Sequence, residues 1–167
     1  MGTALWTIGV DIGSVGVKAV LMRGSEWADR CVVPTGWNPG ETGTDACARL
    51  LERNGLTRGD VARTVATGYG RNAVEADGRV TEISCHAVGA GFLFPPFSDA
   101  GAERGVRTIL DIGGQDSKAI ALDRGGNVVN FLMNDKCAAG TGRFLQNMAV
   151  IRTTALNFIR WILIRAR

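Results

Sequence analysis

The chain has 167 residues, 46% of them hydrophobic, and a formal net charge of +3. This length allows one domain with a sizeable core, or two small lobes that share an interface. The positive charge is local: without the four arginines at 152, 160, 165 and 167, the chain has 15 basic and 16 acidic side chains. We therefore expect no nucleic-acid partner.

No apolar stretch reaches the length that a bilayer requires, and residues 1–11 show neither a basic segment nor a cleavage site. We therefore expect a cytoplasmic protein with no membrane partner. The cysteines at positions 31, 47, 85 and 137 are widely spaced and form no C-x-x-C pattern. We expect no disulfide, and the default interpretation of each cysteine is a small buried hydrophobic residue.

Near the N-terminus, the apolar runs Leu5–Val10 and Val17–Met22 predict two strands around a glycine-bearing turn, Asp11–Gly16. An acidic residue at a strand end can hold Mg²⁺ through water, and glycine N–H groups and a serine hydroxyl can contact phosphate oxygens. Lys18 follows on the second strand. An ordinary hairpin with a solvated turn is the alternative, and neither the P-loop pattern nor G-x-G-x-x-G is present.

The middle of the chain predicts a loop, two helices and a strand. Glycine, proline and asparagine predict a loop over Thr35–Gly43, and apolar spacing predicts a helix over Asp45–Arg53, which stops at Asn54-Gly55. The segment Val61–Thr67 is predicted to form a strand that leads into a glycine turn. Thr81–Phe94 predicts a helix closed by two prolines. In that helix, Cys85 and His86 taken alone are more typical of surface or core residues than of ligands.

A second hairpin is predicted over Val106–Leu122, followed by a tight turn and a strand over Val128–Met133. Cys137 then lies close to the N-terminus of a helix predicted over residues 138–149, where the helix dipole stabilises a thiolate. A small residue packed under the glycine turn is the alternative for Cys137.

The two hairpins match each other at an offset of one hundred positions. Asp11-Ile12-Gly13 aligns with Asp111-Ile112-Gly113, and Lys18-Ala19 aligns with Lys118-Ala119. Agreement of this extent in the same strand-turn-strand context indicates an internal duplication. Two matched copies favour a phosphate-binding interpretation over an ordinary turn.

Two such hairpins resemble the phosphate loops of the actin, Hsp70 and sugar-kinase ATPase superfamily. The segments NDKCAAGTGRFL (134–145), EISCHA (82–87) and TGYGR (67–71) resemble one of its families closely, the ATP-dependent activators of 2-hydroxyacyl-CoA dehydratases. The match covers residues 7–148. It implies an α/β, ribonuclease H-like ATPase fold with a complete first lobe at 1–100, a truncated second lobe at 101–149 and a divergent tail at 150–167.

The resemblance also implies a site. Its cofactors would be ATP, Mg²⁺ and a [4Fe–4S] cluster that bridges the two subunits of a homodimer, with Cys85 and Cys137 of each chain as ligands. The residues implied for hydrolysis are Asp11, Asp111 and Gln115. The residues implied for phosphate and Mg²⁺ binding are Gly13, Ser14, Gly16, Lys18, Gly113, Gly114 and Asp116.

The implied function is the ATP-driven transfer of a low-potential electron from a donor such as ferredoxin or flavodoxin to a 2-hydroxyacyl-CoA dehydratase. Three alternatives stay open: an ATPase subunit of benzoyl-CoA reductase, a sugar or N-acetylhexosamine kinase, and a non-catalytic remnant. The remnant is considered because residues 150–167 contain no glycine-rich adenine loop. For that reason we expect weak ATP binding and slow turnover, or none.

Overall fold

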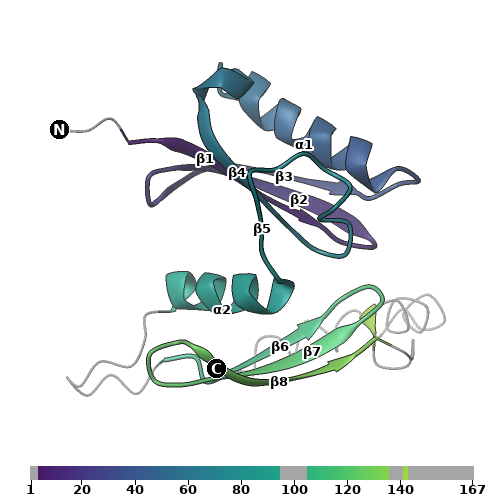
Figure 1. Cartoon of the computed structure of the whole chain (residues 1–167), viewed down its shortest axis with the longest axis vertical. Helices are drawn as coiled ribbons and strands as arrows, with labels where there is room; N and C mark the ends of the chain where they lie inside the picture. The colour runs from purple at the N-terminus through teal and green to yellow at the C-terminus, as the bar shows by residue number, and fades with distance from the viewer. Residues whose placement is uncertain (1–3, 95–104, 136–140, 143–167) are drawn as a thin grey trace, which may run out of the picture.

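The fold consists of two β-sheets, each with a helix packed on one face (Figure 1). The computed structural model describes residues 4–94, 105–135 and 141–142. The first sheet has five strands in the order β3-β2-β1-β4-β5, and the second has three in the order β6-β7-β8. The strand bounds are β1 Trp6–Ile12, β2 Gly16–Arg23, β3 Glu26–Pro34, β4 Val61–Thr67, β5 Gly78–Arg79, β6 Thr108–Ile112, β7 Ser117–Leu122 and β8 Val128–Asn134.

The core of the first sheet forms where α1, Pro39–Arg53, packs across β1, β2 and β3. Alternating apolar residues of β1 and β2 face the helix, and Ile12, Leu21 and Leu50 are fully buried. Burial of each contributes roughly 1.5–3 kcal/mol. A short 3₁₀ helix, Arg58–Asp60, leads from α1 into β4, which pairs in parallel with β1 and so places the turn after β4 beside the first hairpin.

One expectation for this sheet was wrong, and strand β3 was missed. Residues 35–43 are not all loop, because α1 begins at Pro39, where the Asn38 side chain accepts the Glu41 backbone N–H. Strand β3 was not predicted at all. Its residues are mostly exposed and lack strict alternation, and its pairing with β2 has an irregular register. The predicted strands β1, β2 and β4 and the end of α1 at Asn54 are confirmed.

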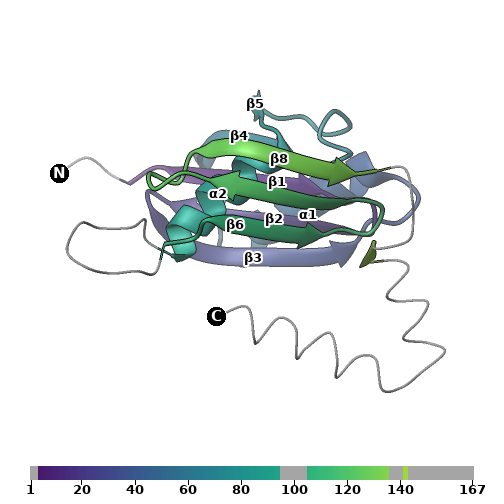
Figure 2. The same cartoon turned by 90° about the horizontal axis from the view of Figure 1, so that it is seen from below.

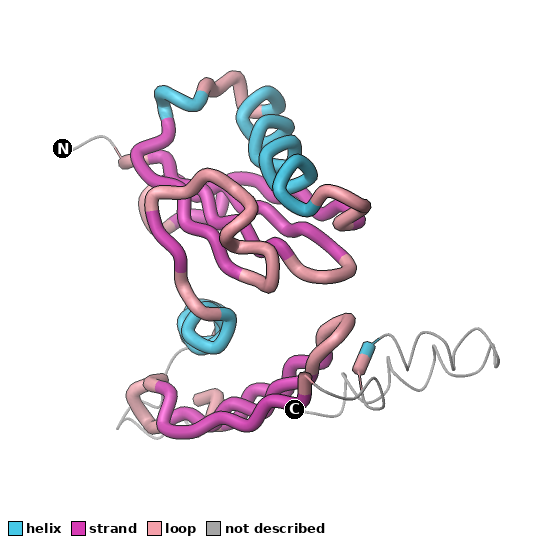
Figure 3. The backbone as a smooth tube through the Cα atoms, turned by 45° about the vertical axis from the view of Figure 1, so that its right-hand side comes forward, coloured by secondary structure: helices cyan, strands magenta, loops and turns pink. Residues whose placement is uncertain are grey.

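The helix predicted over Thr81–Phe94 is confirmed as α2, which spans Glu82–Leu93, and Thr81 is its N-cap residue. It lies between the two sheets (Figures 1 and 3) and packs on the second sheet, where Ala87 meets Ile120 and Leu122 of β7. The predicted first lobe, 1–100, includes this helix, and that boundary stays a prediction. Strands β6, β7 and β8 confirm the second hairpin and the strand after it. Figure 2 shows the second sheet in front of the first.

In the described part of the chain, no helix combines the length and the apolar character needed to cross a membrane. The helix predicted at 138–149 lies outside the described residues except for positions 141 and 142, and Cys137 lies outside them as well.

Candidate functional site

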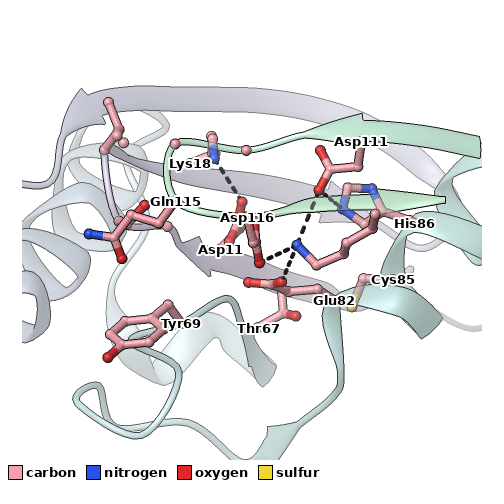
Figure 4. A pocket seen from close by; sticks show the side chains of 17 residues that line it. Asp11, Lys18, Thr67, Tyr69, Glu82, Cys85, His86, Asp111, Gln115 and Asp116 are labelled. Atoms are coloured by element: carbon pink, nitrogen blue, oxygen red, sulfur yellow. Dashed lines mark hydrogen bonds and ion pairs between the residues drawn. The ribbon is translucent and has the colours of Figure 1, made fainter. Parts of the chain in front are cut away.

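A cleft of about 260 Å³ lies where the turns of the two hairpins face each other. Residues from both hairpins, from the turn after β4 and from the first turn of α2 line it (Figure 4). Every predicted site residue within the described part of the chain lines this cleft: Asp11, Gly13, Ser14, Gly16, Lys18, Cys85, Asp111, Gly113, Gly114, Gln115 and Asp116. Residues more than one hundred positions apart thus form one site.

The first hairpin presents a carboxylate and an ammonium group to the cleft. Asp11 and Lys18 are cross-strand partners in the β1–β2 ladder, and Lys18 Nζ lies 2.9 Å from Asp11 Oδ2. The turn between them closes through the Gly13 N–H, which donates to the Gly16 carbonyl at 3.2 Å. Thr35 fixes the turn from outside, since its hydroxyl donates to the Gly13 carbonyl at 2.6 Å.

The second hairpin repeats this register, with Asp111 opposite Lys118. Its lysine has a different environment. Lys118 Nζ contacts Asp111 at 3.2 Å, Asp116 at 2.7 Å and Glu82 of α2 at 2.7 Å. The Gly142 N–H also donates to the Gly113 carbonyl at 2.6 Å. This bond joins the glycine turn of the 134–145 motif to the second hairpin.

The turn after β4 packs directly against the first hairpin. The Gly70 N–H donates to the Ile12 carbonyl at 2.9 Å, and Gly68 has φ +91°. A Cβ at Gly68 would overlap the Asp11 carboxylate and lie 2.6 Å from the Ile12 carbonyl, so only glycine fits there. The Arg71 side chain donates to the Gly68 carbonyl at 3.1 Å.

Thr67 contributes a hydroxyl that sequence reasoning did not identify. It is the register partner of Asp11 across the β1–β4 pair and lines the cleft. Its Oγ1 is buried, and within the described residues it has no hydrogen-bond partner. Because buried polar groups are nearly always paired, such an atom at a cleft suits a bound ligand or water.

The first two turns of α2 bring Cys85 and His86 to the cleft. His86 Nε2 lies 3.3 Å from Asp111 Oδ2. The hydrogen bond from His86 lowers the pKa of Asp111 to about 2, against the opposing effect of burial. The same bond raises the pKa of His86. His86 was expected to be an ordinary surface or core residue, and the structure instead pairs it with a predicted catalytic carboxylate.

The cleft residues Glu82, His86 and Lys118 were also absent from the predicted site. Lys118 could have been found, because it is the counterpart of Lys18 at the offset of one hundred positions. Glu82 and His86 stand in the EISCHA segment, but nothing in the sequence indicates that this helix packs on the second hairpin.

The oxygen-rich lining of the cleft fits Mg²⁺. Mg²⁺ prefers oxygen ligands and usually binds one or two carboxylates together with waters and phosphate oxygens. Asp11 and Asp111 supply the carboxylates, and the Thr67 hydroxyl adds a buried oxygen without a described partner. Within the described residues, no three histidine, cysteine or acidic side chains are grouped as a self-contained metal site.

The thiol of Cys85 fits the role of one ligand of an iron–sulfur cluster. It is free, partly exposed and located in the first turn of α2, where it lines the cleft. The second predicted ligand, Cys137, lies outside the described residues. Cys31 is buried, and desolvation raises the pKa of Cys47 to about 11, so both belong to the core of the first sheet.

The comparisons with known proteins agree on one family. The model of the BadF/BadG/BcrA/BcrD ATPase family matches residues 8–157. The activator of lactoyl-CoA dehydratase from Anaerotignum propionicum is 47% identical over 159 residues, which is 92% of this chain and 56% of that protein.

Two solved structures are also similar. The activator of the 2-hydroxyisocaproyl-CoA dehydratase from Clostridium difficile, with bound ADPNP, is 42% identical and has a TM-score of 0.74 over 88% of this chain and 52% of its own. Component A of the (R)-2-hydroxyglutaryl-CoA dehydratase from Acidaminococcus fermentans is 40% identical and has a TM-score of 0.76 over 89% of this chain and 54% of its own. The chain thus spans about half the length of the relatives it matches. The structural similarity confirms the predicted fold of the actin, Hsp70 and sugar-kinase type.

Proposed function

The chain belongs to the BadF/BadG/BcrA/BcrD ATPase family, and from this premise we propose that its cleft binds the phosphates of ATP with Mg²⁺. The observation that carries the proposal is the convergence of two register-matched Asp–Lys hairpins on one cleft. A similar structure, 42% identical, holds the ATP analogue ADPNP.

In this proposal, the residues of the chain act mainly by position and charge. Lys18 and the glycine N–H groups of the two turns bind phosphate oxygens. Asp11 and Asp111 hold the metal ion, and Gln115, which also lines the cleft, orients the attacking water. Mg²⁺, when bound, neutralises charge on the phosphate oxygens.

We propose further that Cys85 and Cys137 of two chains bind one [4Fe–4S] cluster at a two-fold axis. Four thiolates are the usual ligand set, and a symmetric dimer supplies them from two cysteines per chain. Such a cluster supplies one-electron chemistry at low potential. The dimer would then activate a 2-hydroxyacyl-CoA dehydratase, the role for which the similar activator proteins are named.

The first test removes one carboxylate charge at a time. Asp11→Asn and Asp111→Asn should each abolish ATP hydrolysis and weaken Mg²⁺-dependent ADPNP binding at least about tenfold, because an amide does not replace a carboxylate toward Mg²⁺. Isothermal titration calorimetry measures the binding, and Asp45→Asn on the exposed side of α1 is the charge-matched control. Wild-type chain that shows no saturable ADPNP binding would contradict the proposed site.

The second test concerns the cluster. After anaerobic purification, Cys85→Ser and Cys137→Ser should each lose iron, sulfide and the visible chromophore, because each variant leaves only two of four thiolates. Cys31→Ser and Cys47→Ser should retain them, since these residues lie in the core of the first sheet. Iron that depends on Cys31 or Cys47 would refute the ligand assignment.

A further inference from the structure

The two duplicated lysines have the same place in the backbone but different surroundings. Lys18 pairs with Asp11 and Lys118 with Asp111 in the same register. The side chain of Lys18 is 49% exposed, whereas that of Lys118 is 3% exposed. In the described part of the chain, Lys18 contacts one carboxylate and Lys118 contacts three.

The contacts of Lys118 use its full capacity for hydrogen bonds. An ammonium group has three N–H donors and no acceptor. Carboxylates of Asp111, Asp116 and Glu82 lie 2.7 to 3.2 Å from Nζ, which leaves no donor for a phosphate.

The three carboxylates come from two elements. Asp111 and Asp116 belong to the second hairpin, and Glu82 lies in the first turn of α2. A second contact between the same elements, from His86 to Asp111, lies one helical turn further along. The first two turns of α2 are therefore attached to the second hairpin by two side-chain contacts, of which the ion pair through Lys118 is the more buried.

We propose that the two lysines have diverged: Lys18 contacts the ligand, whereas Lys118 is a positioning residue that holds Asp111 and Asp116 and ties them to Glu82 of α2. Burial alone would lower the pKa of Lys118, but its hydrogen bonds to Asp116 and Glu82 outweigh this and raise the pKa. Lys118 therefore stays charged, as its ion pairs with the three carboxylates require. Without it, three carboxylates would face one another in a partly buried site, where the loss of one partner of an ion pair is strongly destabilising.

The test compares the equivalent variants Lys18→Met and Lys118→Met by hydrogen exchange of the α2 backbone amides in the ligand-free chain. Lys118→Met should raise the exchange rates of residues 82–93 at least about tenfold, because the tie between helix and hairpin is lost. Lys18→Met should leave these rates within about twofold of wild type. Glu82→Gln keeps Lys118 with both hairpin carboxylates, so it serves if Lys118→Met does not fold, and it should loosen α2 in the same direction.

A second measurement, which rests on the proposed function, adds Mg²⁺ and ADPNP. In wild type, binding of Mg²⁺ and ADPNP should change the hydrogen-exchange rates of the α2 amides at least about threefold, because the ligand interacts with Asp111. Glu82→Gln, measured at an ADPNP concentration that saturates it, should lose this response. Unchanged α2 exchange in both ligand-free variants, or equal loosening by Lys18→Met, would overturn the inference. Wild type that fails to bind ADPNP would instead refute the proposed function, and the ligand-free comparison would still decide the role of Lys118.

Discussion

The buried hydroxyl of Thr67 is a single-residue case in which binding and stability should change in opposite directions. Thr67→Val removes a buried polar atom without a described partner, so the free energy of unfolding should rise by up to about 1–2 kcal/mol. The affinity for Mg²⁺-ADPNP should fall, because the same hydroxyl faces the cleft beside Asp11. Chemical denaturation and calorimetry measure the two effects.

Thr35→Val is the matched control. The Thr35 hydroxyl donates to the Gly13 carbonyl at 2.6 Å, so its removal should lower the free energy of unfolding by about 1–3 kcal/mol. Thr67→Val that destabilises the chain like Thr35→Val, with ADPNP affinity intact, would show that the Thr67 hydroxyl has no role toward a ligand.

At this scale, residues within motifs were predictable and their partners were not. Asp11, Lys18 and Asp111 followed from the duplication, and the structure places all three at one cleft. Thr67 and Glu82 were not predictable, because their surroundings depend on long-range packing. The position of Thr67 depends on the parallel register of β1 and β4, and that of Glu82 on the docking of α2.

Among the elements, α1 shows why a glycine-rich segment was misread as a loop. Asn38 and Pro39 form a capping residue and a first-turn proline, which are signals of a helix start. Gly40 and Gly43 obscured them. Both are packing residues here, since a Cβ at Gly43 would lie 2.5 Å from the Ile12 side chain and one at Gly40 would overlap the Ala73 carbonyl. Tertiary contact, rather than turn geometry, explains these glycines.

Asp29 of β3 should make the attachment of α1 depend on pH. Its carboxylate accepts from Arg53 at 2.8 Å and from Asn54 at 2.9 Å, at the C-terminal end of α1. Hydrogen bonds lower the pKa of Asp29 below 3.8. The bond from the Arg30 backbone N–H contributes most, and the bond from the Asn54 side chain contributes next. Because the folded-state pKa lies below the unfolded one, this stabilisation is complete above the unfolded value and is lost as pH falls through the folded value.

The expected result for Asp29→Asn is a lower melting temperature at pH 7 and a difference from wild type that vanishes well below pH 3.8. Thermal melts over a pH series measure it, with Asp45→Asn on α1 as the charge-matched control. A deficit that persists unchanged at the lowest pH would mean that the Asp29 charge is not the cause.

For the whole molecule, the duplication correctly predicted two strand-turn-strand units but not how they are joined. The equivalence of Asp11–Lys18 and Asp111–Lys118 is visible in the sequence and holds in the register of both ladders. The position of α2 between the sheets is not visible, because its apolar residues show no single stripe that would indicate which sheet it covers. The packing of Ala87 and its neighbours on β7 determines which sheet α2 covers.

The outer face of the second sheet should govern self-association of the cluster-free chain. Leu110 and Leu132 flank Ala119 in register across β6, β7 and β8, and they are 75% and 73% exposed. Because exposed apolar patches favour association, sedimentation velocity should show mass that increases with protein concentration. Leu110→Lys combined with Leu132→Glu should abolish the increase, since charged groups resist desolvation. Trp37→Lys, at an exposed position between β3 and α1, should leave it unchanged. Association that survives the double change on β6 and β8 would place the contact on another surface.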